Sequence, residues 1–168
     1  GVMYGVIDFY RAAKAAGIRP ILGCEVYVAP GSRFDKEANG GEDRYYHLVL
    51  LAENNVGYAN LMKIVSRGFT EGYYYKPRVD MELLNRFHEG IIALSACLAG
   101  EVQRYITKDL LEEARKAAKK YEDCFGKGNF FLELQDHGLP EQKIVNTELL
   151  KMSRELGIEL VATNDVHY

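Results

Sequence analysis

The chain has 168 residues, the length of one domain or of part of a larger one. Its 48% apolar and 27% charged residues are typical of a globular protein, and no apolar run approaches the roughly 20 residues that a membrane-spanning helix needs. A net charge of −3 argues against a strongly basic surface that grips nucleic acid by itself. Secretion is not suggested, because no basic segment followed by an apolar one opens the sequence. Cys24, Cys97 and Cys124 are widely spaced, which fits a reducing cytoplasm better than a disulfide framework.

Helix and strand patterns alternate along the chain, which indicates an α/β fold. In the first half of the chain they predict a helix over 6–17, a strand over 19–30, an exposed Gly-rich loop over 31–44, a strand over 46–53 and a helix over 55–69. An irregular segment over 70–80 follows, and then a short helix over 81–90, a strand over 91–97 and a short helix within 98–108. The last predicted elements are a helix over 109–126, a strand over 129–137, a helix over 139–157 closed by Gly157, and a strand over 158–168. Continuous apolar strands separated by helices imply a parallel sheet buried on both faces. Such sheets carry their chemistry at the carboxyl ends of the strands.

Side chains of the kinds that bind Zn, Mn or Fe lie in these strands or near their ends. Asp165 and His167 are two positions apart in the last strand, so they should point to one face about 7 Å apart and could hold one ion or two adjacent ions. A strand end that turns polar as it meets solvent explains the pair equally well. Glu25 interrupts an apolar strand, and a buried carboxylate needs a cation, a metal or several donors. For Glu25 we favour a metal over a salt bridge.

Three further candidates are ambiguous when each is taken singly. His47 lies near the start of its strand and is more often a hydrogen-bonded core histidine, while Cys97 is more often a small buried hydrophobe. His137 lies where the chain leaves its strand, and a turn with a capping aspartate explains QDHG at least as well as a site does. None of the three predicts a site by itself.

The stretch YYYKPR at 73–78 places Lys76 and Arg78 beside three tyrosines. Such a group can hold a phosphate or a stacked base. A loop whose tyrosines cover the sheet and whose cations are solvated is somewhat favoured on chemistry alone.

Taken together and in order, these residues resemble one family. The stretches MYGVIDFYRAAKAAGIRPILGCEVYVAP, YHLVLLAENNVGYANLMKIVS, GYYYKPRVD, ALSACLAGEV, ELQDHGLPEQ and LVATNDVHY closely resemble the PHP (polymerase and histidinol phosphatase) domain in the N-terminal region of bacterial replicative DNA polymerase III alpha subunits. The resemblance covers essentially the whole chain, so residues 1–168 are expected to be a partial PHP domain. It implies a distorted (β/α)7 barrel with up to three divalent metal ions, Zn, Mn or Fe, at one mouth.

The resemblance also assigns roles to residues of this chain. Glu25 and His47 fall on metal-binding positions, Cys97 falls on a position that is His or Cys in the family, and Asp165 and His167 fall on the closing Asp-x-His pair, which is metal-binding and catalytic. By the same resemblance, Lys76 or Arg78 neutralises a substrate phosphate. His137 matches a family motif without being placed in the metal shell, and is kept as a substrate-phosphate candidate.

The chain departs from the family pattern at its beginning. An early His-x-His, a following acidic residue or histidine, and an Asp-His-Gly should lie upstream of MYGVIDFY, whereas this chain begins at Gly1. The expectation is therefore a barrel that lacks its first strand or strands, has one open edge and holds metal weakly. Without polymerase palm, fingers and thumb, the chain should not make DNA by itself.

The function implied is that of a part of a DNA replication enzyme. Its relatives are metal-dependent phosphoesterases, and in some members the activity is 3′–5′ exonuclease proofreading. One alternative is a non-catalytic scaffold that docks a separate proofreading subunit, and another is a free-standing PHP phosphatase. The expected partners are DNA, through the parent polymerase, and other replicase subunits, in the cytoplasm and without a membrane.

Overall fold

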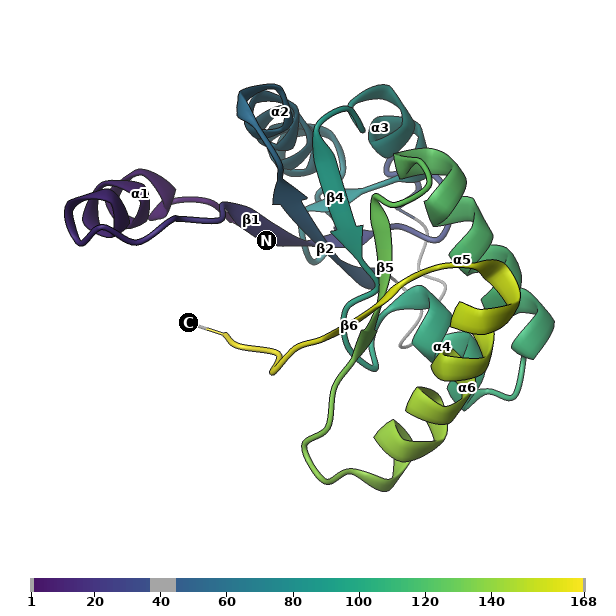
Figure 1. Cartoon of the computed structure of the whole chain (residues 1–168). Coiled ribbons are helices and arrows are strands. Elements are labelled where there is room, and N and C mark those ends of the chain that lie inside the picture. Colours follow the sequence, from purple (N-terminus) through teal and green to yellow (C-terminus); the bar gives the residue numbers. More distant parts are fainter. Residues whose placement is uncertain (1, 37–44, 168) are drawn as a thin grey trace.

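The computed structural model describes residues 2–36 and 45–167, and within them it shows a mixed α/β fold (Figure 1). The elements are α1 (Val6–Ala15), β1 (Gly23–Val28), β2 (Tyr46–Ala52), α2 (Asn55–Glu71), β3 (Arg78–Val79), α3 (Met81–Arg86), β4 (Ile91–Leu94), α4 (Glu101–Thr107), α5 (Leu111–Phe125), β5 (Phe130–Leu134), α6 (Pro140–Leu156) and β6 (Leu160–Ala162). Most predicted helices and strands are confirmed with shorter ends. None of the described helices has the length and apolar character needed to cross a membrane.

Some sequence expectations differ from the structure. The predicted irregular segment over 70–80 contains β3, which pairs with β1. The last strand is much shorter than 158–168, since β6 ends at Ala162. Gly157 does end its helix, in the left-handed conformation that glycine adopts without a Cβ penalty. Of the predicted loop over 31–44, residues 37–44 lie outside the described part of the chain.

The described strands form one sheet in the order β3-β1-β2-β4-β5-β6. The expectation of a parallel sheet is wrong for two pairs, because β2 runs antiparallel to both β1 and β4. The remaining pairs, β1–β3, β4–β5 and β5–β6, are parallel. The segment between β1 and β2 is a predicted loop rather than a helix, and antiparallel neighbours need no crossover helix.

The sheet is buried on one face and half-buried on the other, which also differs from the expectation. In β1 and β2 buried and partly exposed residues alternate, with Val26, Leu48 and Leu50 on the buried face. Helices α2, α5 and α6 contact this sheet, and the core forms against them. Figure 1 shows α1 apart from the sheet and the other helices, on the side where β1 begins. The half-buried face is therefore left free to line a cavity.

The two faces of β2 make a stability prediction. Leu50 is fully buried on the helix-facing side, so Leu50→Ala should lower the free energy of unfolding by about 2–5 kcal/mol, through lost burial and the cavity left behind. The matched variant Leu51→Ala changes the next residue, which is partly exposed on the opposite face, and should cost less. Urea denaturation of both variants measures the difference. Equal losses would contradict the assignment of the two faces.

Candidate metal centre

Two candidate ligands lie on the half-buried face of the sheet. In the β1–β2 register Glu25 pairs with Val49 and Tyr27 pairs with His47, which puts the four side chains on one face. His47 lies at the beginning of β2, whereas chemistry was expected at strand carboxyl ends. Because β2 is antiparallel to its neighbours, its beginning lies beside the end of β1. The His47 Nδ1 atom lies 3.0 Å from Glu25 Oε1.

Cys97 reaches the same place from the turn after β4. The strand ends at Leu94, three residues earlier than predicted, and Ala96 turns the chain with a left-handed φ of 68°. Cys97 is partly buried, and its Sγ lies 3.6 Å from His47 Nδ1. Together with Cys24 and Cys124 it is a free thiol, as expected.

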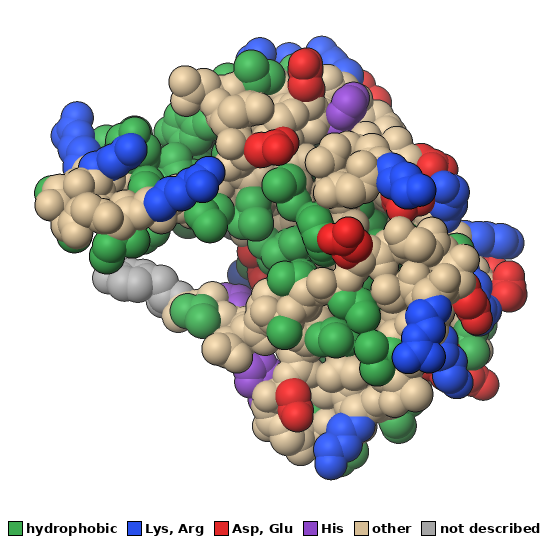
Figure 2. Space-filling model, viewed as in Figure 1, with side chains coloured by type: hydrophobic (Ala, Val, Ile, Leu, Met, Phe, Trp, Pro, Cys, Tyr) green, Lys and Arg blue, Asp and Glu red, His purple; other side chains and the backbone are tan. Residues whose placement is uncertain are grey.

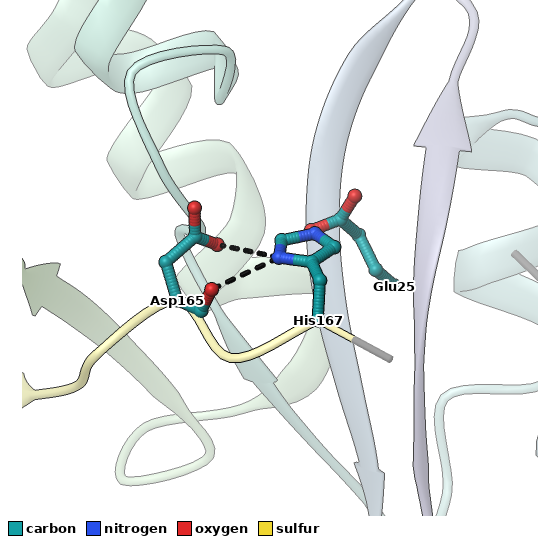
Figure 3. Close-up of side chains that lie close together, drawn as sticks. All are labelled: Glu25, Asp165 and His167. Carbon is teal, nitrogen blue, oxygen red and sulfur yellow. Dashed lines mark hydrogen bonds and ion pairs between the residues drawn. The ribbon is translucent and has the colours of Figure 1, made fainter.

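The closing pair arrives from the segment after β6, not from a strand. Asp165 has a φ of 52°, so the expectation that both side chains point to one face of an extended strand is wrong. The turn instead folds the pair together: His167 Nδ1 lies 2.9 Å from the Asp165 backbone oxygen and 3.7 Å from Asp165 Oδ1. His167 Nε2 lies 3.6 Å from Glu25 Oε2. Figure 3 shows the imidazole between the two carboxylates.

These contacts join residues from four parts of the chain into one group, which we call the ligand cluster: Glu25, His47, Cys97, Asp165 and His167. One ligand atom each from Glu25, Asp165 and His167 lie within 4.8 Å of one another, the arrangement expected of groups that could share an ion. Two carboxylates, two imidazoles and a thiol form the mixed N/O/S donor set that suits Zn, Mn or Fe. Glu25, Asp165 and His167 therefore fit a divalent transition metal, and His47 and Cys97 adjoin them through the contact between His47 and Glu25.

The surroundings of the two imidazoles in the cluster favour their protonated forms. Burial disfavours the charged form of His47, but hydrogen bonds and charge interactions with Cys97 and Glu25 outweigh it and raise the pKa of His47 to about 9. The hydrogen bond from His47 in turn lowers the pKa of Glu25, against the effect of burial. The hydrogen bond with the Asp165 backbone oxygen, and the nearby carboxylates, raise the pKa of His167. The site thus attracts positive charge, which a metal ion would supply by displacing those protons.

A cavity of about 860 Å³ opens beside the cluster. Its lining combines Glu25, Asp165 and His167 with an aromatic and cationic side formed by Phe69, Tyr73, Tyr75 and Lys76. Figure 2 shows the surface hollowed beside the C-terminal segment, with acidic and histidine side chains at the edge of the hollow. Lys76 is exposed here, as the phosphate-binding prediction requires.

The other two substrate-phosphate candidates lie elsewhere. Arg78 is 3% exposed, and its guanidinium donates to the backbone oxygens of Gly72, Arg33 and Asp35 at 3.2, 3.1 and 2.7 Å. It holds the loop after β1 and is not presented to the cavity. His137 is exposed beyond the end of β5 and is not among the residues that line the cavity beside the cluster. Of the three, the structure brings Lys76 alone to that cavity.

The sequence analysis missed two residues that line this cavity, Glu133 and Thr163. Glu133 is 4% exposed in the middle of the apolar strand β5. The argument that singled out Glu25, a carboxylate inside an apolar strand, applies equally to Glu133 and could have found it. Thr163 carries no comparable signal in the sequence.

Comparison with known proteins shows the family of this chain. The PHP domain family matches residues 1–137. The DNA polymerase III subunit alpha of Treponema pallidum (strain Nichols) is 50% identical over 168 residues, which is all of this chain and 14% of that protein. The subunits of Deinococcus radiodurans and Thermus aquaticus are 50% and 46% identical, again over all of this chain and over 13% and 14% of their own length.

The chain thus spans about a seventh of the length of these curated relatives. The family pattern covers most of its residues, and each of these relatives aligns over all of it. The chain belongs to the PHP domain family.

Proposed function

We propose that this chain is part of a bacterial replicative DNA polymerase III alpha subunit and carries a metal-dependent phosphoesterase site. The main support for this proposal is that the five residues of the ligand cluster lie together in the structure. In the sequence they are up to 142 positions apart, from Glu25 to His167. Their chemistry matches the roles that the family resemblance assigns. The alpha-subunit relatives support the replication context.

We propose that residues 1–168 form one partial PHP domain with the (β/α)7 barrel topology. In support, β6 pairs with β5 in the same sheet although it lies beyond the family match, which ends at residue 137. The sheet curves and has helices on its outer side, as a barrel wall does (Figure 1).

The ligand cluster would hold the divalent metal ions, for which Zn, Mn and Fe are the candidates, with up to three in an intact domain. When bound, such ions supply Lewis acidity for phosphodiester hydrolysis by activating water and neutralising charge on phosphate oxygens. The chain's own residues do the rest. Cys97 and His47 would form one side of the metal site, and Asp165 and His167 would form the other, with Glu25 in contact with both histidines between them.

The far side of the cavity supplies the substrate contacts. Lys76 places a cation where the phosphate of a substrate would lie, and Tyr73 and Tyr75 offer ring faces on which a nucleotide base can stack. These features favour a nucleotide phosphodiester over a small phosphomonoester. A 3′–5′ exonuclease reaction on DNA is the form of hydrolysis that we propose.

A scaffold that docks a separate proofreading subunit is the alternative. The five ligand-type side chains linked by contacts favour catalysis, because docking of another subunit does not require that donor set. DNA and other replicase subunits are the proposed partners, and the cytoplasm is the proposed location.

Asp165→Asn is the direct test of the hydrolytic proposal. It removes one negative charge from the cluster, so phosphodiester hydrolysis by the polymerase subunit containing this domain should fall at least about a hundredfold, with polymerisation nearly unchanged. Asp123→Asn, which alters an exposed carboxylate on α5, is the control and should retain both activities. Equal loss of both activities in Asp165→Asn would make the site structural.

Metal binding should depend on pH through His47. Below its pKa of about 9 the imidazole is protonated, and metal must displace that proton. Apparent Zn²⁺ affinity should therefore rise between pH 6 and 9, by up to about tenfold per pH unit for each proton displaced. Calorimetric titration in two buffers of different ionisation enthalpy measures the released protons. His88→Gln, at an exposed histidine outside the cluster, should leave the profile unchanged, and a flat profile for the wild-type chain would contradict the prediction.

Lys76→Gln should weaken substrate binding. Loss of the cation should raise the KM for a short single-stranded oligonucleotide by about tenfold, the effect of one charge-assisted contact, with a smaller change in kcat. Lys63→Gln is the matched control, because Lys63 lies over the Phe87 ring rather than at the cavity. An unchanged KM for Lys76→Gln would remove this residue from the substrate site.

A further inference from the structure

Glu133 is a buried carboxylate whose charge is met by neutral donors. It is 4% exposed, and its Oε1 accepts a hydrogen bond from the Ala96 backbone N–H at 3.0 Å. Its Oε2 accepts from Gln135 Nε2 at 3.1 Å and from Thr163 Oγ1 at 2.6 Å. Among the described ion pairs none involves Glu133. Such a group is costly to bury, and these three bonds are what stabilise it.

Two of those donors belong to the segments that carry the ligand cluster. Ala96 immediately precedes Cys97, and it holds the left-handed φ of 68° that turns the chain toward His47. This conformation is unfavourable for a residue with a Cβ and persists where surrounding contacts impose it. The bond from its N–H to Glu133 is one such contact.

Thr163 lies on the opposite side of Glu133, two residues before Asp165. Its backbone N–H bonds to the Leu134 oxygen at 3.1 Å, which keeps it beside β5 after β6 has ended. The hydroxyl bond to Glu133 is therefore the last side-chain attachment on the described path from the sheet to Asp165 and His167.

A second polar group secures the Cys97 turn from behind. Ser95 Oγ accepts from the Glu133 backbone N–H at 2.9 Å and from Gln103 Nε2 at 2.8 Å, and Gln103 also donates to the Ala96 oxygen at 3.1 Å. The turn is thus held on both sides, and Glu133 is the residue that connects it to the C-terminal segment.

We propose that Glu133 is a positioning residue that couples the two halves of the metal centre, Cys97 on one side and Asp165 with His167 on the other. The inference rests on the proposed function, since it takes the ligand cluster to bind a divalent metal. Glu133 acts through the Ala96 N–H and the Thr163 hydroxyl. The Glu133 carboxylate faces neutral donors, whereas the Glu25 carboxylate faces the two imidazoles of the ligand cluster.

Co²⁺ titration of the full chain tests the coupling, because thiolate-to-cobalt charge-transfer absorption reports ligation by Cys97. Glu133→Gln replaces an acceptor by a donor facing Gln135 and Thr163, so Co²⁺ affinity should fall about tenfold and the charge-transfer band per bound ion should weaken. Thr163→Val removes the hydroxyl attachment of the C-terminal segment and leaves the bond between Ala96 and Glu133 in place, so affinity should fall while the band is kept. Glu122→Gln, at another buried carboxylate that bonds Lys119 on α5, should change neither.

The metal-free chain gives a second readout. Hydrogen exchange over residues 95–97 and 163–167, and alkylation of Cys97, which is more exposed than Cys24 and Cys124, should both be faster in Glu133→Gln. Circular dichroism verifies that each variant folds. If Glu133→Gln does not fold, the rate of hydrogen exchange over residues 163–167 in Thr163→Val tests the proposal instead. The proposal would be overturned if the folded variants had the same Co²⁺ affinity, the same charge-transfer spectrum and the same hydrogen-exchange rates as the wild-type chain. If the wild-type chain itself binds no Co²⁺, the proposed function fails, and the exchange data alone uphold or overturn the positioning role.

Discussion

The cost of placing carboxylates on the inner side of a sheet governs this structure. Glu25 is half-buried there and Glu133 is buried, so each needs hydrogen-bond or ionic partners. Glu25 finds imidazoles, and Glu133 finds neutral donors from two distant segments. Partners of these two carboxylates belong to the turn after β4 and to the segment after β6. The need to satisfy the carboxylates therefore also determines where these two segments run.

The same constraint explains how a protein with a net charge of −3 can have a strongly cation-seeking site. Hydrogen-bond acceptors and carboxylates are concentrated around His47 and His167, where hydrogen bonds and the nearby charges raise the pKa of both imidazoles. Without metal, protons supply the positive charge. A divalent ion bound at the proposed site would replace them and gain the same attraction, so protonation and metal binding would compete for one set of groups.

The antiparallel direction of β2 is the structural detail that makes the cluster complete. It brings His47, at the beginning of its strand, beside the end of β1 and the turn that carries Cys97. A parallel strand would place the same histidine at the opposite edge of the sheet. The mixed sheet therefore adds a ligand that an all-parallel arrangement would keep away.

Most of the helices, and the choice of Glu25, Asp165 and His167 as candidate ligands, could be read from local patterns, because periodicity and the cost of a buried charge act over a few residues. The sequence resemblance added His47 and Cys97. Strand direction, the turn at Asp165 that replaced the predicted strand, the burial of Arg78 and the coupling through Glu133 were decided by tertiary structure. Each depends on which distant segment supplies a hydrogen-bond partner, and local sequence does not encode that choice.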